Sequence, residues 1–253
     1  MEAIDIAIDY LLKANAIDDI NYNVKDDKLR ALMNITMPTY LPEEYYYYQD
    51  LALQRRLKHK EIIDVNNLKY ESNISIYKGD ITLLKADAIV NACNKYLLGC
   101  FSPLHSCIDN AIHSFGGLQI RRDLMEIMKT KEYEENGKCE VTKAYNLPSK
   151  YVFHTVGPII EGRVTKEDVE DLRNCYISCL KKAVDMKLQT IVFCSISTGV
   201  YNFPIMLASK IAIETILEFQ RKNKTNLKII LDVFSEKDCD VYEQTFREIV
   251  KGI

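Results

Sequence analysis

Cys100, His105 and Cys107 form a C-x4-H-x-C arrangement within eight residues. Two thiolates and one imidazole suit zinc, because soft sulfur and borderline nitrogen match its ligand preferences. Three protein ligands leave a fourth position open, which is typical of a catalytic rather than a structural zinc site. The alternative is that three unrelated polar residues share a loop, and the spacing alone favours that alternative.

A helix is expected to begin at about Ile108, directly after the last of these residues. Cys107 would then lie at a helix start, where the helix dipole lowers the pKa of a thiol. Asp109 falls in the first turn, where a carboxylate stabilises the helix N-terminus. His113, further along, is expected to be a hydrogen-bonded core residue rather than a fourth ligand.

Three further polar segments follow short apolar runs, as loops after strands do: Gly79-Asp80-Ile81, Val90-Asn91-Ala92-Cys93-Asn94 and Ser195 to Tyr201. The Asp can accept a hydrogen bond from an amino group, and the paired Asn residues can cap loops or hold sugar hydroxyls. In the third segment, Gly199 is expected where a Cβ would clash, and hydroxyls and N–H groups surround a phosphate. The helix opened by Pro204 adds its positive end. Considered alone, each of these segments is also consistent with an ordinary turn that binds no ligand.

Strands and helices are expected to alternate from about residue 73 onward. This order predicts a three-layer α/β/α domain with a mostly parallel mixed sheet, which binds ligands beyond the carboxyl ends of its strands. Strands are expected at 74–77, 88–92, 152–155, 191–194 and 227–234. Helices are expected from about 108 to a break at 116–117, onward to about 129, and at 166–186, 204–221 and 238–250.

Residues 1–70 are expected to form a helical N-terminal extension to a domain spanning 71–253. Apolar residues recur there at helical spacing, and Pro42-Glu43-Glu44 is typical of a helix start. The tyrosine run at 45–48 is interpreted as amphipathic packing rather than base stacking, because four consecutive residues point all round a helix.

The bulk composition narrows the classes of partner. A formal net charge of −3 argues against bulk nucleic-acid binding, and 47% hydrophobic residues can fill a core. The sequence has neither a secretory signal pattern nor an apolar run long enough to span a membrane, so a cytoplasmic protein with mostly reduced cysteines is expected.

Four motifs in this order resemble those of the macrodomain family: the three loops above and Asp109-Asn110-Ala111-Ile112-His113. The resemblance covers about residues 70 to 250 and implies that the chain binds ADP-ribose. By that resemblance Asp80 would meet the adenine with Ile81 beside it, and Asn94 would hold the ribose distal to the adenine. The diphosphate would be wrapped by Ser197, Thr198, Gly199, Val200 and Tyr201, with Phe203 near the adenosine end.

The chain departs from the common macrodomain pattern at one segment. Many members have a glycine-rich stretch there, whereas this chain has Cys100, His105 and Cys107. Cys93 replaces the usual alanine, and Asn202 replaces a frequent glycine. In these ligands the chain looks like the zinc-containing macrodomains that accompany ADP-ribosylating sirtuins in microbes and also carry a helical N-terminal extension. The resemblance implies a zinc cofactor, a mono-ADP-ribosylated protein substrate and a functional link to such a sirtuin.

The expected reaction is glycosidase- or esterase-type hydrolysis at the ribose proximal to the modified protein side chain. Zinc would act as a Lewis acid, Asp109 would position or deprotonate the water, and Asn94 would align the sugar for attack. Two alternatives stay open. One is a non-catalytic ADP-ribose reader with a structural zinc, and the other is a deacetylase acting on O-acetyl-ADP-ribose.

Overall fold

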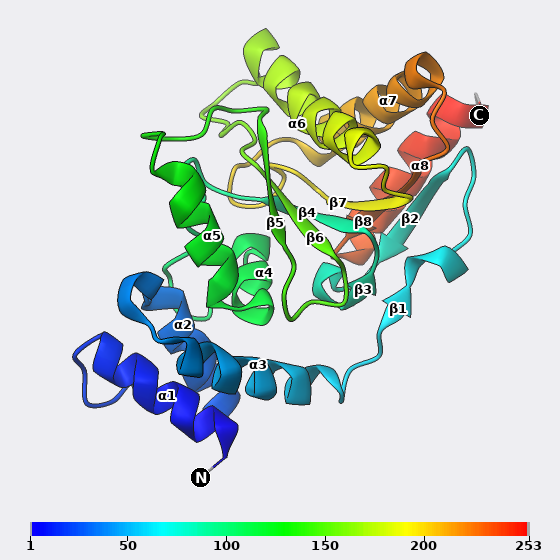
Figure 1. Cartoon of the computed structure of the whole chain (residues 1–253). Coiled ribbons are helices and arrows are strands. Elements are labelled where there is room, and N and C mark those ends of the chain that lie inside the picture. Colours follow the sequence, from blue (N-terminus) through cyan, green and yellow to red (C-terminus); the bar gives the residue numbers. More distant parts are fainter. Residues whose placement is uncertain (1, 252–253) are drawn as a thin grey trace.

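A six-stranded mixed sheet forms the centre of the part of the chain that follows the first three helices (Figure 1). The computed structural model describes residues 2–251. The strand order is β2-β8-β7-β4-β6-β5, and every neighbouring pair is parallel except β5 with β6. The strands are β2 (Ile74–Lys78), β4 (Ala88–Ala92), β5 (Cys139–Lys143), β6 (Tyr151–Thr155), β7 (Thr190–Cys194) and β8 (Lys228–Val233). The predicted mostly parallel sheet is confirmed.

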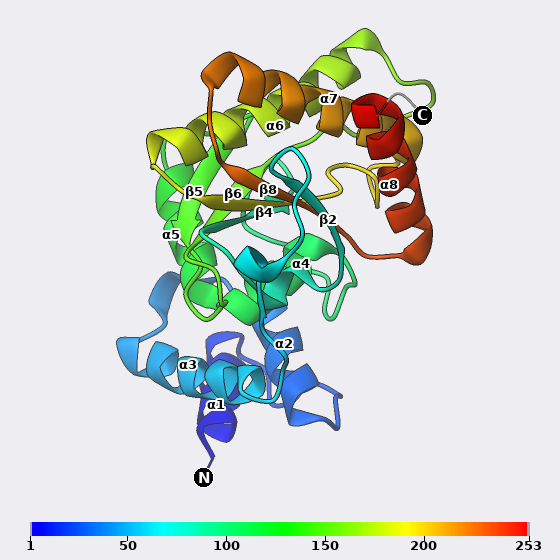
Figure 2. The same cartoon turned by 90° about the vertical axis from the view of Figure 1, so that its right-hand side faces the viewer.

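Helices cover both faces of the sheet, as predicted (Figure 2). On one face lie α4 (Ile108–Gly116) and α5 (Leu118–Met128), and on the other lie α6 (Lys166–Asp185) and α7 (Ile205–Asn223). Helix α8 (Glu236–Lys251) packs against α7 and contacts β2 and β8. Because both faces are covered, the central strands are mostly apolar, and every residue of β7 is buried.

Local signals in the sequence explain where these helices begin and end. Thr165 caps α6 by accepting a hydrogen bond from the N–H of Asp168, whose carboxylate accepts in return from the N–H of Thr165. Gly117 separates α4 from α5 with a φ of +102°, a conformation that favours glycine. Pro204 directly precedes α7, as expected.

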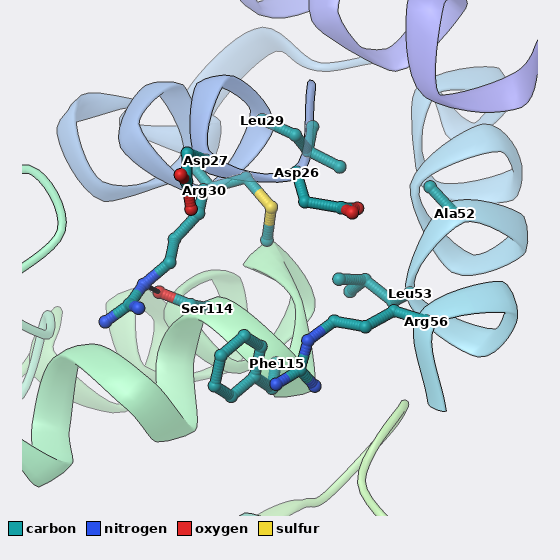
Figure 3. A pocket seen from close by; sticks show the side chains of 10 residues that line it. Asp26, Asp27, Leu29, Arg30, Ala52, Leu53, Arg56, Ser114 and Phe115 are labelled. Atoms are coloured by element: carbon teal, nitrogen blue, oxygen red, sulfur yellow. Dashed lines mark hydrogen bonds between the residues drawn. The ribbon is translucent and has the colours of Figure 1, made fainter. Parts of the chain in front are cut away.

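The N-terminal helices α1 (Ala3–Ala14), α2 (Lys25–Ile35) and α3 (Glu43–Leu57) form a second hydrophobic cluster, which Leu118 of α5 joins. Tyr45 and Tyr46 are buried in it whereas Tyr47 is exposed, so the packing interpretation of the tyrosine run is confirmed. A cavity of about 230 Å³ lies between α2, α3 and α4 (Figure 3). Among the described residues, no helix is long and apolar enough to cross a membrane.

Three strands were not predicted from the sequence. Strand β5 lies at the sheet edge and is only partly buried over most of its length, so its apolar pattern is weak. The other two are the parallel pair β1 (Ile63–Asp64) and β3 (Leu84–Lys85). Two residues are too few for a period-2 pattern to be recognised.

Candidate active site

A cavity of about 1030 Å³ opens at the carboxyl ends of β2, β4, β7 and β8. The loop that precedes α4 completes its wall. The strand order reverses between β4 and β7, because the chain continues from β4 to β5 and β6 on one side and then returns to β7 and β8 on the other. Ligand crevices of open α/β sheets lie at such reversals. The topology of the sheet therefore determines where this cavity forms.

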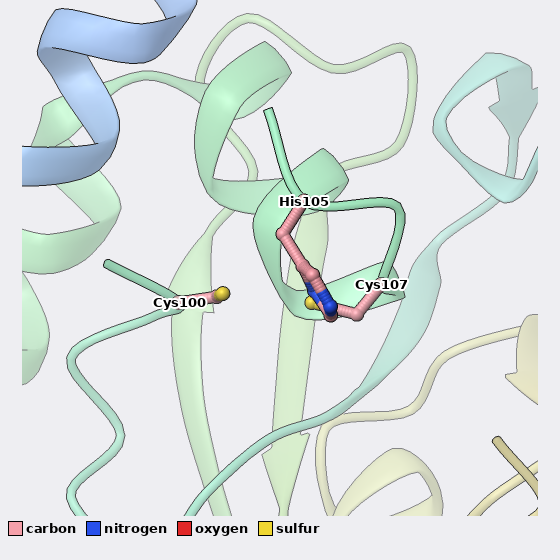
Figure 4. A group of neighbouring side chains, drawn as sticks. All are labelled: Cys100, His105 and Cys107. Carbon is pink, nitrogen blue, oxygen red and sulfur yellow. The ribbon is translucent and has the colours of Figure 1, made fainter. Parts of the chain in front are cut away.

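The side chains of Cys100, His105 and Cys107 converge on one wall of the cavity (Figure 4). Their ligand atoms all lie within 4.8 Å of one another. Nδ1 of His105 is buried and has no hydrogen-bond partner among the described residues. A buried polar atom without a partner requires an explanation, and an imidazole nitrogen beside two thiols is satisfied by a metal ion. The sulfur and nitrogen donors fit zinc.

Cys107 is the N-cap residue of α4, and its Sγ accepts a hydrogen bond from the N–H of Asn110 at 3.4 Å. Burial is the main cause that raises the pKa of Cys107 to about 12; the Asn110 N–H acts in the opposite direction, and the neighbouring Cys100 thiol adds to the increase. When only the groups of the protein act on it, burial raises the pKa of the Cys107 thiol more than the helix start lowers it. The expectation of a low pKa is therefore wrong in the absence of a metal ion. A cation between the two sulfurs would reverse this balance, because a coordinating thiol is deprotonated.

Asp109 lies in the first turn of α4, lines the cavity and is only 5% exposed. Its Oδ1 accepts a hydrogen bond of 2.8 Å from Nδ2 of Asn91, at the end of β4. Burial raises the pKa of Asp109 to about 6, although Asn91 and Arg121 act in the opposite direction. A general base works best when its pKa is close to the operating pH. This carboxyl has the burial and the pKa that suit such a role.

His113 belongs to the core and is separate from the Cys/His cluster. Its Nε2 lies 3.5 Å from Oδ1 of Asp109, but in the described structure neither ring nitrogen makes a hydrogen bond. Burial lowers the pKa of His113 well below its ordinary value, so the ring is neutral and the contact is not an ion pair. His113 is thus a core residue, as expected, but the hydrogen bonds expected for it are absent from the described part of the chain.

A second wall of the cavity carries two carboxyl groups. Oδ1 of Asp80 accepts hydrogen bonds from the N–H and the hydroxyl of Thr82, at 2.9 and 2.6 Å, and thereby caps the 3-10 turn at Ile81–Leu83. Asp232, near the end of β8, has a buried Oδ1 with no partner in residues 2–251. Burial raises the pKa of Asp232, and the charge of Asp80 raises it further. The exposed side chain of Phe234, two residues after Asp232, also lines the cavity.

The loop after β7, from Ser195 to Tyr201, forms a third wall. The hydroxyl oxygens of Ser195 and Ser197 are buried and lack hydrogen-bond partners in the part of the chain that the structure describes. Oγ of Ser197 lies against Gly157, where an added Cβ would come within 2.1 Å of it. The positive φ values of this loop fall on Ser197 (63°) and on Asn202 (57°), just beyond it. A glycine is therefore frequent at the Asn202 position for a conformational reason, and asparagine tolerates the same φ.

The expectation for Gly199 is wrong. Its φ is not positive, and a Cβ placed there would meet no described atom within 4 Å. The residue therefore relieves no clash inside the protein. Because Gly199 has no side chain, the cavity wall has open space at this position, which a ligand can occupy.

The structure brings nearly all of the predicted site residues to one cavity. Those that line it are Asp80, Ile81, Asn94, Cys100, His105, Cys107, Asp109, Ser197, Thr198, Gly199, Val200 and Tyr201. Phe203 is the exception: it is 2% exposed, belongs to the core cluster and does not line the cavity among the described residues, so its place near the adenosine end stays a prediction. Phe234 and Asp232 were missed. Their position at the carboxyl end of β8 is the signal that would have identified them.

Comparisons with known proteins give one consistent family. The family model described as "Macro domain" matches residues 90–212. A protein-ADP-ribose hydrolase of Treponema medium is 42% identical over 252 residues, covering 94% of this chain and 95% of that protein. A protein-ADP-ribose hydrolase of Staphylococcus aureus (strain MRSA252) is 42% identical over 221 residues, covering 86% and 83%.

Solved structures of macrodomains share the fold. The Oceanobacillus iheyensis macrodomain with ADP has a TM-score of 0.66 and 33% identity, and the match covers 74% of this chain and 97% of that one. The Trypanosoma brucei macrodomain in complex with ADP-ribose has a TM-score of 0.65 and 29% identity, and the match covers 85% and 94%.

Proposed function

This chain belongs to the Macro domain family, and from that premise we propose that it is a zinc-dependent hydrolase that removes mono-ADP-ribose from modified protein side chains. The names of its relatives from Treponema medium and Staphylococcus aureus support the activity. One observation carries the proposal. The Cys/His cluster, the buried carboxyl of Asp109 and the loop after β7 all line the same cavity.

The three walls of the cavity account for the parts of ADP-ribose. Asp80 accepts a hydrogen bond from the adenine amino group, since its Oδ1 is already bonded to Thr82 and its other oxygen remains for the ligand. The N–H groups and hydroxyls of the loop from Ser197 to Tyr201, which lines the cavity, donate to the diphosphate. Phosphate binding there is aided by the N-terminal end of α7, which follows the loop.

The Cys/His cluster and Asp109 lie where the ribose bonded to the protein would be cleaved. Asn94 helps to orient that ribose, although its amide also supports its own loop by donating to the carbonyl of Gly99 and accepting from the N–H of Tyr96. Asp109 accepts a proton from the attacking water. Water adds across the bond between ribose and side chain, and the side chain leaves with a proton.

Cys100, His105 and Cys107 would hold the zinc ion. When bound, the ion would act as a Lewis acid towards an oxygen of the ribose or a water molecule. The residues of the chain bind the nucleotide, orient the sugar and exclude bulk water from the partly buried Cys/His cluster. The known preference of zinc for sulfur and nitrogen ligands supports this choice of metal.

One experiment tests the proposal against two alternatives. Purified protein is incubated with a mono-ADP-ribosylated protein and, separately, with O-acetyl-ADP-ribose, each with and without a chelator. We expect release of ADP-ribose from the modified protein, loss of release with chelator and recovery with added zinc. Binding of ADP-ribose without release would indicate a reader with a structural zinc, and activity only on the acetylated metabolite would indicate a deacetylase.

A functional link to an ADP-ribosylating sirtuin, in the cytoplasm, is a further part of the proposal and rests on the resemblance of the zinc-ligand motif. A protein modified by such a sirtuin should be a better substrate than one modified by an unrelated ADP-ribosyltransferase. Equal rates on both substrates would argue against the link.

A further inference from the structure

Residues 98–107, called here the ligand loop, carry all three members of the Cys/His cluster and form neither helix nor strand. One backbone hydrogen bond, from the N–H of His105 to the carbonyl of Ser102 at 3.2 Å, lies within the loop among the described residues. Leu104 has a φ of +55°, which is uncommon for a leucine. A loop with so little internal bonding and one strained residue has to be held from outside.

Arg30 of α2 supplies one external support. Its Nη2 donates to the carbonyl oxygen of His105 at 3.0 Å and to Oδ1 of Asn110 at 2.7 Å, and its Nε also donates to Oδ1 of Asn110, at 3.1 Å. Nδ2 of Asn110 donates in turn to the carbonyl oxygen of Ser102 at 2.9 Å. One guanidinium thus joins the ligand loop to the first turn of α4.

Asn34, one helical turn further along α2, supplies a second support. Its Oδ1 accepts a hydrogen bond of 3.0 Å from the N–H of Leu104, the residue with the uncommon φ. Its Nδ2 donates to the hydroxyl of Ser114 on α4 at 2.9 Å. Asn34 is 1% exposed, so the loss of either bond would leave a buried group without a partner. Residues four apart share a helix face, and Asn34 and Arg30 therefore act on the same loop.

The side chain of Arg30 is held both by these hydrogen bonds and by the ring of Phe115, whose centroid lies 5.3 Å from its guanidinium carbon. Arg30 lines the cavity between α2, α3 and α4, and Figure 3 shows its guanidinium directed towards Ser114. Arg56 of α3 lies over the ring of Phe115, with its guanidinium carbon 3.5 Å from the ring centroid. The N-terminal helices therefore contact both the ligand loop and α4, the helix whose first turn carries Asp109.

We propose that Arg30 and Asn34 are positioning residues that hold the ligand loop in the conformation that brings Cys100, His105 and Cys107 together. The N-terminal helices then support the conformation of the candidate active site in addition to packing against the domain. The inference rests on the proposed function for the identity of the metal, but not for the geometry of the loop.

The test compares Arg30→Met, Arg30→Lys and Asn34→Ala with Gln49→Ala as a matched control. Gln49 is a buried residue of α3 that bonds the N–H of Leu118 and the side chain of Gln119, so it joins the same helices to the domain without touching the ligand loop. Amide hydrogen exchange of residues 102–107 is measured on chelator-treated protein. Zinc affinity by chelator competition, the absorption spectrum of the cobalt-substituted protein and ADP-ribose affinity by calorimetry are measured separately.

We expect Arg30→Met and Asn34→Ala to speed exchange in the ligand loop by about tenfold or more, and to weaken zinc binding by about 10–100-fold, as losses of outer-shell partners do. ADP-ribose affinity should change by less than about threefold. Arg30→Lys keeps the charge and one donor group, so its effects should be smaller, and it remains informative where the other variants fold poorly. Gln49→Ala should lower the melting temperature and leave loop exchange and the cobalt spectrum as in the wild type.

Wild-type exchange rates in the loop of all three variants would overturn the inference, as would equal loop effects in Gln49→Ala. A wild-type protein that takes up no zinc would defeat the proposed metal role alone. The exchange measurement on chelator-treated protein still decides the positioning role in that case.

Discussion

Nδ2 of Asn91 donates a 2.8 Å hydrogen bond to Oδ1 of Asp109, and this bond joins the end of β4 to the first turn of α4. Both residues are buried, so the bond holds the carboxyl in one orientation. With Oδ1 engaged by Asn91, the other carboxylate oxygen remains for the water molecule that we propose Asp109 activates.

Asp109→Asn should therefore lower turnover by about 100- to 10,000-fold, the usual range for loss of a general base. The amide oxygen of the variant still accepts from Asn91, so the fold and ADP-ribose binding should change little. Single-turnover release of ADP-ribose from modified protein, with calorimetry and thermal unfolding alongside, measures all three. Turnover close to the wild-type rate would remove Asp109 from the mechanism.

His105→Ala should cost several kcal/mol in activation free energy while changing ADP-ribose binding by about 1 kcal/mol. The reason is that the groups proposed to bind the nucleotide lie on other walls of the cavity, and only interactions stronger in the transition state accelerate a reaction. The paired measurement is single-turnover rate against calorimetric affinity. Joint loss of folding, binding and turnover would instead indicate a structural zinc, and retained turnover would reject a catalytic one.

Protein purified without chelator should carry about one zinc ion per chain, held by the two thiols and the imidazole of the cluster. Cys100→Ala and Cys107→Ser should each lose most of it in elemental analysis. Cys239→Ser is the matched control, because this partly exposed thiol lies on α8 outside the cluster. Full zinc content in both cluster variants would contradict the ligand assignment.

Asp80→Ala should weaken ADP-ribose binding by about 1–3 kcal/mol, because the adenine amino group loses a charged acceptor. Asp64→Ala controls for the local turn. Asp64 also caps a 3-10 turn, accepting from the N–H of Asn66 at 3.0 Å, but it does not line the cavity among the described residues. Calorimetry that finds equal affinities for the two variants would place the adenine elsewhere.

Asp232→Asn should stabilise the protein at neutral pH. An unfolded aspartate loses its proton near pH 3.9, whereas burial raises the pKa of Asp232 in the folded state. Between those two values the folded state binds more protons, so wild-type stability falls as the pH rises. Asparagine cannot ionise, and the variant should gain about 1.4 kcal/mol for each unit of pKa difference.

The gain should vanish below about pH 4, where both states of the wild type are protonated. Denaturant unfolding at pH 4 and pH 7 measures it, with Asp240→Asn, an exposed residue of α8, as control. Stability differences that do not vary with pH would show that Asp232 titrates alike in the folded and unfolded states.

Local sequence was enough to predict five of the six strands of the main sheet and the Cys/His cluster. Parallel strands buried on both faces are short apolar runs, and the helices between them show their own periodicity and caps, so most elements were placed to within a few residues. The cluster was predictable because its three ligands lie within eight residues, and a single loop can bring them together.

The tertiary structure decided what depends on surroundings distant in the sequence. Phe203 and Phe234 both follow strands, yet one is buried in the core and the other is exposed on the cavity, and only packing distinguishes them. The pKa of Cys107 depends on burial that the spacing does not reveal. Arg30 reaches the carbonyl of His105 across 75 residues of sequence, and such a contact exists only once the N-terminal helices pack against α4. Periodicity reports which face of an element is buried, but not which distant side chain meets it there.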